Sequence, residues 1–215
     1  VSEMLIFPKD LLLQGVFFYA IIKTKMITSE NVERQGMWAT PFAGVMLDYI
    51  DNKALEKYIL DFKKNTKSRD VSNEGGWQQS LPQDIHPVFN DLVKSIHIAS
   101  KTFEIKPGPK KINLQMWVNV NDKGHWNNLH DHVGAEISGI YYVKVPKDSG
   151  HISFRDPRAI TISEQSGENP KWVNIEPNQG VLMLFPGYLE HMVKPNQSDE
   201  SRISIAFNLF IYDDK

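Results

Sequence analysis

The 215-residue sequence contains no cysteine, and this absence excludes several kinds of chemistry. Disulfide bonds, thiol nucleophiles, cysteine-based zinc sites and iron–sulfur clusters all need the missing side chain. Neither positive nor negative charge is in large excess, because 24 Lys and Arg and 26 Asp and Glu give a net charge of −2. We therefore expect neither nucleic acid nor an anionic membrane as a partner. Any metal would have to be bound by His, Asp or Glu.

Long hydrophobic runs are scarce as well. The most apolar stretch, residues 11–22, contains Gln14 and Gly15 and is too short to cross a bilayer. It is followed by Lys23-Thr24-Lys25, which does not resemble a signal-peptide cleavage site, so we predict a cytoplasmic protein.

The first part of the chain differs in pattern from the rest. We expect residues 1–35 to be a leader or N-terminal extension and residues 36–215 to form one domain. Removing residues 1–25 should leave folding unchanged, and an insoluble truncated protein would contradict this expectation.

Two helices and a series of short strands are predicted beyond residue 36. Apolar side chains recur at helical spacing in residues 52–65 and 88–103, whereas Pro41 makes residues 37–47 an edge strand at best. After Pro107-Gly108-Pro109, strands are predicted at residues 112–120, 137–145, 151–155, 172–176, 180–185 and 202–211. This order indicates a mainly β protein of the α+β class, a sandwich or barrel with two helices packed on one outer face.

Two of these strands have one apolar and one polar face. The even positions are apolar in residues 112–120, and the odd positions are apolar in residues 203–209. Because strand side chains alternate between faces, the polar faces lie either in water or along a cavity inside a barrel.

Four of the seven histidines lie between residues 125 and 151, among them His130 and His132. Their i, i+2 spacing places two imidazoles on the same face of an extended strand. His191 follows a distant hydrophobic strand and turn. Two ligands from one strand and a third from another describe a facial triad in a double-stranded β-helix, and neutral imidazoles suit Fe, Ni, Cu or Zn.

Arg202 and Ser204 share the polar face of the last strand. An arginine facing a barrel interior is costly unless it meets an anion, and its planar fork binds a carboxylate through two hydrogen bonds. We therefore interpret the pair as a carboxylate-binding site. Trp117 and Trp126 are candidates for the pocket wall.

These residues, with Ile140-Tyr141-Tyr142 between them, resemble the 2-oxoglutarate- and Fe(II)-dependent oxygenases of the prolyl hydroxylase-like class. More narrowly, the chain resembles a family of small oxygenases of that class, and the resemblance covers residues 37–211. The motifs that carry it occur in the family's order: Thr40-Pro41-Phe42, Gly75 to Ser80, Met116 to Val120, Asn128 to Val143, Phe154 to Arg158, Gly180 to His191 and Arg202 to Asn208.

The resemblance implies a double-stranded β-helix, or jelly roll, in which His130, His132 and His191 hold Fe(II). Arg202 and Ser204 would hold the distal carboxylate of 2-oxoglutarate, Tyr142 would reach the same group, and Asn119 is a weaker candidate for cosubstrate binding. The implied reaction is hydroxylation with O2 of an unidentified peptidyl side chain or small metabolite. The sequence leaves the oligomeric state open, with a homodimer as one option.

One position departs from the pattern, since most members of the superfamily have Asp or Glu where this chain has His132. A carboxylate ligand could instead come from Glu136 or Asp131. The spacing of Gly124, His130, His132 and Glu136 is also similar to a cupin motif, which would give a metal site of three His and one Glu without 2-oxoglutarate dependence. The cupin alternative gives no reason for Arg202 and Ser204, and a metal-free binding jelly roll gives no reason for the three histidines.

Overall fold

The computed structural model of the chain describes residues 40–103, 110–158 and 172–213, so the predicted boundary at residue 36 and residues 1–25 lie outside the part described. In chain order the elements are β1 (Ala43–Met46), α1 (Asn52–Asn65), β2 (Asn73–Glu74), β3 (Trp77–Ser80), the 3-10 turn Pro87–Phe89, α2 (Asn90–Ser100), β4 (Lys110–Asn121), β5 (Trp126–His130), β6 (Ile137–Lys144), β7 (Ile152–Arg155), β8 (Trp172–Ile175), β9 (Val181–Pro186), β10 (His191–Val193) and β11 (Arg202–Asp213).

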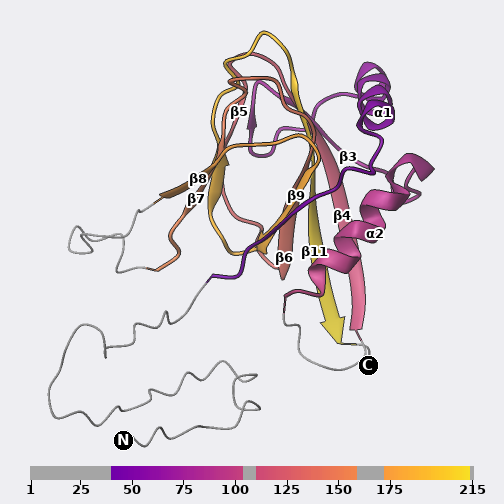
Figure 1. Cartoon of the computed structure of the whole chain (residues 1–215), viewed down its shortest axis with the longest axis vertical. Coiled ribbons are helices and arrows are strands. Elements are labelled where there is room, and N and C mark those ends of the chain that lie inside the picture. Colours follow the sequence, from indigo (N-terminus) through magenta and orange to yellow (C-terminus); the bar gives the residue numbers. More distant parts are fainter. Residues whose placement is uncertain (1–39, 104–109, 159–171, 214–215) are drawn as a thin grey trace, which may run out of the picture. The chain divides into compact units, whose positions relative to one another are not determined.

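The strands form two antiparallel sheets that face each other (Figure 1). The larger sheet has the order β1-β9-β6-β11-β4-β3, and the smaller has the order β2-β5-β10-β7-β8. Apart from β3 with β4 and β7 with β8, neighbouring strands are not consecutive in the chain, as when β11 lies between β4 and β6. This arrangement is a double-stranded β-helix, and it confirms the predicted fold class.

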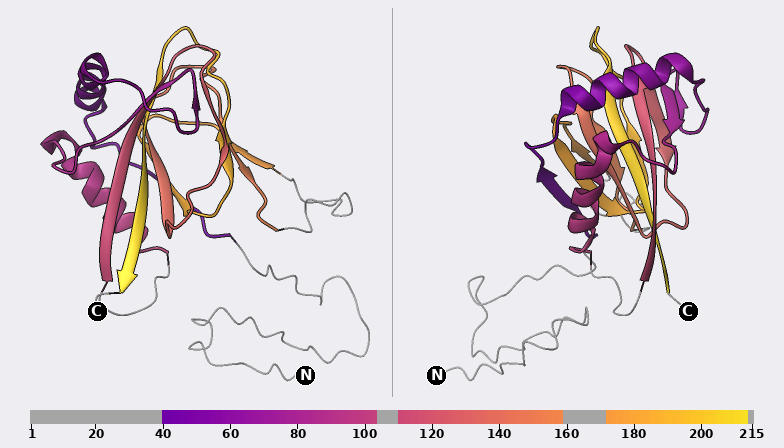
Figure 2. Two further views of the ribbon diagram at one scale, coloured as in Figure 1. Left: turned by 180° about the vertical axis from the view of Figure 1, so that it is seen from behind. Right: turned by 90° about the vertical axis from the view of Figure 1, so that its right-hand side faces the viewer.

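Both helices cover the outer face of the larger sheet (Figure 2). Helix α1 begins where the side chain of Asp51 accepts a hydrogen bond from the Ala54 amide at 3.0 Å, and it buries Leu55 and Ile59 completely. Burying a side chain of this size stabilises the fold by about 1.5–3 kcal/mol. The apolar faces of β4 and β11 pack under the helices through Met116, Val118, Val120, Ile203, Ile205, Phe207 and Leu209.

A second apolar cluster lies between the two sheets and contains Ile140, Tyr142, Ile152, Phe154, Met183, Phe185, Leu189 and Val193. Of the two explanations left open for the polar faces of β4 and β11, each applies to one part. Trp117, Asn119, Arg202 and Ser204 line a cavity, whereas Asn113 and Gln115 are exposed to water.

No strand was predicted between the two helices, yet β2 and β3 form there. Gly75 makes the turn between them with a φ of +75°. β3 exists because Trp77 to Ser80 pair with Trp117 to Val120, a contact between segments distant in sequence. The predicted edge strand near Pro41 is β1, which pairs with β9. No helix in the described ranges is long and apolar enough to cross a membrane.

Candidate active site

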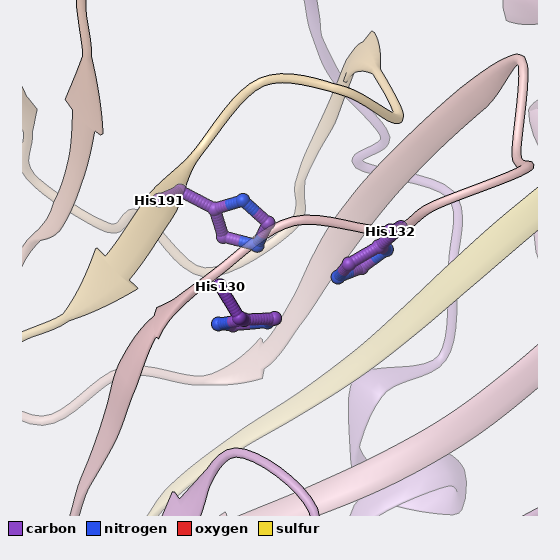
Figure 3. Close-up of side chains that lie close together, drawn as sticks. All are labelled: His130, His132 and His191. Carbon is purple, nitrogen blue, oxygen red and sulfur yellow. The ribbon is translucent and has the colours of Figure 1, made fainter.

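Three histidines converge on one point between the sheets (Figure 3). His130 ends β5, His191 begins β10, and the two residues are direct partners in the antiparallel pairing of these strands. His132 lies two residues beyond β5. One potential ligand nitrogen from each of the three rings lies within 4.8 Å of the other two, which is the arrangement of a metal site.

The hydrogen bonds of the three rings define which nitrogen faces the centre. Nδ1 of His130 donates to the carbonyl of Asn128 at 2.7 Å, and Nδ1 of His191 donates to the carbonyl of Leu189 at 2.9 Å. Nδ1 of His132 donates to Oδ1 of Asn208. An amide or carbonyl oxygen only accepts, so each Nδ1 carries the proton and each Nε2 keeps a lone pair for a metal.

Burial keeps these imidazoles neutral. Desolvation lowers the pKa of His191 to about 3 and that of His132 to about 4, and it also lowers the pKa of His130. The neighbouring imidazoles lower the pKa of His191 further, because two adjacent positive rings repel each other. At neutral pH all three rings are therefore in the form that binds metal ions.

A pocket extends from the histidines along the polar faces of β4 and β11, and its lining includes Trp117, Asn119, Arg202 and Ser204. Ser204 pairs with Asn119 on β4 and with Tyr142 on β6, so three polar side chains meet at one level of the larger sheet. The structure thus places the predicted carboxylate-binding residues in the same pocket as the histidines.

Arg202 is 1% exposed and meets no carboxylate in the described part of the chain. Its Nη1 donates to the carbonyls of Ser149, of Gly150 at 3.2 Å and of Lys194 at 3.4 Å. Its Nη2 is buried and has no hydrogen-bond partner among the described residues. Burial lowers the pKa of Arg202 to about 10, so the group is still a cation at neutral pH. A buried cation with a free donor is costly unless an anion binds there.

Two more buried polar atoms in this region lack partners within the described ranges, namely the Tyr142 hydroxyl and Oδ1 of Asn119. Burial raises the pKa of Tyr142, so its hydroxyl stays protonated and can donate a hydrogen bond. Unsatisfied buried polar groups are rare in folded proteins. The Tyr142 hydroxyl, a donor beside Arg202, fits a pocket for an anionic ligand, whereas Oδ1 of Asn119 is an acceptor and needs a donor.

Comparison with known proteins agrees with this geometry. Residues 115–208 match the model of a family described as "Putative 2OG-Fe(II) oxygenase". This stretch includes the three histidines, Arg202 and Ser204. Residues 115–208 thus belong to the 2OG-Fe(II) oxygenases. No curated protein matches the sequence of this oxygenase.

Several solved structures share the fold of the oxygenase. A prolyl-4-hydroxylase of Pseudomonas putida has a TM-score of 0.59 at 13% identity, over 80% of this chain and 92% of the other. The viral collagen prolyl hydroxylase of Paramecium Bursaria Chlorella virus-1, in a 2OG complex, has a TM-score of 0.56 at 16% identity, over 78% and 94%. HygX of Streptomyces hygroscopicus, with nickel and 2-oxoglutarate bound, has a TM-score of 0.55 at 12% identity, over 80% and 83%.

Neither predicted carboxylate joins the three histidines of the oxygenase. Among the described residues the metal-binding group contains His130, His132 and His191 alone. Glu136 is exposed, and its Oε2 accepts a hydrogen bond from the Ile211 amide at 2.8 Å, because β11 has no neighbouring strand on that side beyond Leu209. Asp131 is exposed as well. The cupin alternative required Glu136 as a ligand, and this contact disagrees with it.

Two residues that the sequence did not single out support the site of the oxygenase. Gly187, between β9 and β10, accepts a hydrogen bond from the His132 amide at 2.8 Å through its carbonyl. A Cβ at this position would lie 2.1 Å from the Ala135 carbonyl oxygen, so only glycine permits the approach. Asn208 is the other, and its contact with His132 joins segments 76 residues apart. Two signals for Asn208 were present in the sequence, namely its place on the Arg202 face and its position at the end of the Arg202 to Asn208 motif.

Proposed function

We propose that His130, His132 and His191 hold Fe(II), and that Arg202, Ser204 and Tyr142 hold the distal carboxylate of 2-oxoglutarate. The enzyme would then hydroxylate a peptidyl side chain or a small metabolite. One observation carries the proposal: a buried arginine without an anionic partner shares a pocket with three histidines that present lone pairs. A protein that bound only a metal would have no use for that cation.

The residues of the chain have separable tasks in this reaction. When bound, Fe(II) and 2-oxoglutarate would supply the oxidative chemistry, in which O2 oxidises 2-oxoglutarate to succinate and CO2 and provides the oxygen for the new hydroxyl group. Arg202 orients the cosubstrate through its unpartnered Nη2 and neutralises its distal charge. Ile140, Ile152 and Phe185 line the same pocket and exclude water from it.

Because all three proposed ligands are neutral, no protein ligand would balance the positive charge of the metal. We therefore expect Fe(II) to be held less tightly than in a site with one carboxylate ligand, and we expect the anionic cosubstrate to strengthen its binding. Asn119 lines the same pocket and lies on the strand beside Ser204, so we expect its side-chain NH2 to donate a hydrogen bond to the cosubstrate.

The solved structures that share the fold leave both substrate classes open. One is a Trichoplax adhaerens prolyl hydroxylase in complex with a peptide fragment, and another is HygX with hygromycin B bound. We accordingly propose the reaction class and leave the substrate as either a peptidyl side chain or a small metabolite. A cytoplasmic location and a homodimer are predictions from the sequence, and neither is needed for the proposed chemistry.

The proposal is tested by anaerobic titration of the metal-free protein with Fe(II) and then with 2-oxoglutarate. We expect a metal-to-ligand charge-transfer band in the visible spectrum when both are present. Binding of Fe(II) without such a band would favour a protein of the metal-binding cupin type. Loss of Fe(II) binding is expected for His191→Ala, and a variant that kept full occupancy would remove this residue from the site.

A second arm tests the cosubstrate residues. Arg202→Ala should weaken 2-oxoglutarate binding by about 10- to 100-fold, the value of one or two charge-assisted hydrogen bonds, and should change Fe(II) binding far less. Arg69→Ala is the control, because Arg69 is exposed and its Nη1 donates to Ser80 outside the pocket. Equal 2-oxoglutarate affinity in Arg202→Ala and the wild type would contradict the assignment.

A further inference from the structure

The Nδ1 atoms of the three histidines donate to two kinds of acceptor, backbone carbonyls and a side chain. His130 and His191 each donate to the backbone carbonyl of the residue two positions earlier. These acceptors belong to the local chain, so a side-chain substitution does not remove them. His132 instead donates to the side chain of Asn208 on β11. The orientation of this one ring therefore depends on a residue from a remote strand.

Asn208 is itself held by a second side chain. The hydroxyl of Ser138 on β6 donates to the same Oδ1 of Asn208 at 2.7 Å, and Ser138 is fully buried. Ser138 and Asn208 are direct partners in the pairing of β6 with β11. Because two donors meet one oxygen, the carbonyl end of the amide faces His132 and the NH2 end faces away.

His132 needs this support more than the other two ligands do. It lies beyond the end of β5, in the segment that leads to β6, and its chain neighbours Asp131 and Val133 are exposed. Its ring contacts Trp117 and His130, with centroid separations of 5.4 and 5.2 Å. Ring contacts of this kind limit where the imidazole lies, whereas a hydrogen bond to Nδ1 also fixes its rotation and its tautomer.

We propose that Asn208 is a positioning residue for the metal centre, which turns Nε2 of His132 toward the metal, and that Ser138 holds Asn208 in place. This inference rests on the proposed function in one respect, since His132 must be a metal ligand. One strand would then serve both parts of the site: Arg202 and Ser204 at its beginning face the cosubstrate, and Asn208 six residues after Arg202 orients a metal ligand.

The test is titration of metal-free protein with Co(II), followed by the visible ligand-field bands of the bound ion. Asn208→Leu keeps the size of the side chain and removes the acceptor, and it should weaken Co(II) binding by about 10- to 100-fold and alter the band pattern. Asn208→Asp keeps an oxygen at the same place and should return the affinity to within a few-fold of the wild type. Ser138→Ala should show a smaller loss of affinity.

Gln115→Leu is the matched control. Gln115 is the pairing partner of Asn208 on β4, is exposed and belongs to neither the metal site nor the pocket lining. The same polar-to-Leu change is thus made on the neighbouring strand, and Co(II) affinity and spectrum should not change. Thermal unfolding of each metal-free variant reports on folding separately from metal binding.

The outcomes separate this inference from the proposed function. If the wild type binds Co(II) through the histidines and Asn208→Leu binds it within twofold with the same spectrum, the positioning role is wrong and the metal site stands. If the wild type does not bind Co(II), or if His191→Ala binds it unchanged, the proposed function itself is wrong. Should Asn208→Leu fail to fold, Ser138→Ala decides, and wild-type affinity and spectrum in that variant would overturn the inference.

Discussion

Two adjacent tyrosines on β6 point to opposite faces of the sheet and differ in their hydrogen bonding. Tyr141 faces the helices, and its hydroxyl donates to Oδ1 of Asn52 at 2.9 Å, at the beginning of α1. Tyr142 points to the opposite face, into the apolar cluster between the sheets, and its buried hydroxyl has no partner in the described part of the chain. The Tyr141 hydroxyl is hydrogen-bonded within the protein, whereas the Tyr142 hydroxyl is available to a ligand.

We therefore predict that replacing tyrosine by phenylalanine has opposite effects on stability at the two positions. Tyr142→Phe should leave the metal-free protein equally stable or more stable, by up to about 1–2 kcal/mol, because it removes an unsatisfied buried group. It should also weaken 2-oxoglutarate binding by a few-fold. Tyr141→Phe should lower the free energy of unfolding by about 1 kcal/mol and leave 2-oxoglutarate affinity unchanged.

Urea denaturation of the metal-free proteins and anaerobic 2-oxoglutarate titration of the Fe(II)-loaded proteins measure the two quantities. A loss of stability in Tyr142→Phe together with wild-type 2-oxoglutarate affinity would show that its hydroxyl has a partner within the protein and no role in cosubstrate binding.

At the scale of elements, the free edge of β11 explains the position of Glu136. This strand continues to Asp213, whereas β6 accompanies it only as far as the pairing of Ile137 with Leu209. The carboxylate of Glu136 accepts a hydrogen bond from the Ile211 amide just beyond that point. An exposed strand edge is a template for unwanted pairing, and a charged side chain placed along it discourages such contacts.

We therefore predict that Glu136→Gln does not change metal binding. The amide oxygen can still accept from the Ile211 amide, so the free energy of unfolding should fall by no more than about 1 kcal/mol. Metal titration and urea denaturation of the variant test this. A tenfold or larger loss of metal affinity would instead place Glu136 at the metal and support the cupin alternative.

Much of the fold could be predicted because its elements follow simple periodicities. The alternation in β4 and β11 indicates which face packs under the helices, and the spacing of Leu55 and Ile59 indicates the buried side of α1. The histidines were recognisable because metal binding restricts residue types, and Arg202 was recognisable because a cation on an inward strand face needs an anion.

The remaining features depend on contacts between distant parts of the chain. β3 is short and polar apart from Trp77, and it forms only because β4 is beside it. The alternation of residues around Asn208 would be the same whether its side chain lay in water or next to His132. Glu136 had the correct strand parity for a metal ligand, but the free amide of Ile211 provides a nearer partner. These three features cannot be recognised from a short stretch of sequence, because each depends on a contact with a distant segment.

At the scale of the whole molecule, the site imposes a dependence of stability on pH. The histidines have an ordinary pKa of 6.5 in the unfolded chain, whereas in the folded protein burial lowers that of His132 to about 4 and that of His191 to about 3. Between pH 6.5 and these values the unfolded state binds more protons than the folded state does. Stability contributed by the neutral rings is therefore present above pH 6.5 and lost as the pH falls.

We predict that the metal-free protein loses stability steadily between pH 6.5 and pH 4. For the buried His191 alone the slope is about 1.4 kcal/mol per pH unit. Urea denaturation at a series of pH values measures it. His191→Leu removes this titrating group and should have a flatter profile, so parallel profiles for the two proteins would assign the acid sensitivity to other residues.

The alternation of β11 limits how this protein can change in evolution. Its odd residues from Ile203 to Leu209 belong to the core under the helices, and its even residues supply Arg202, Ser204 and Asn208 to the site. Removing or adding a single residue at Ser204 would exchange the two faces for the rest of the strand. Core and active site would then be lost together, so divergence here must proceed by substitution, and insertions or deletions belong in the loops.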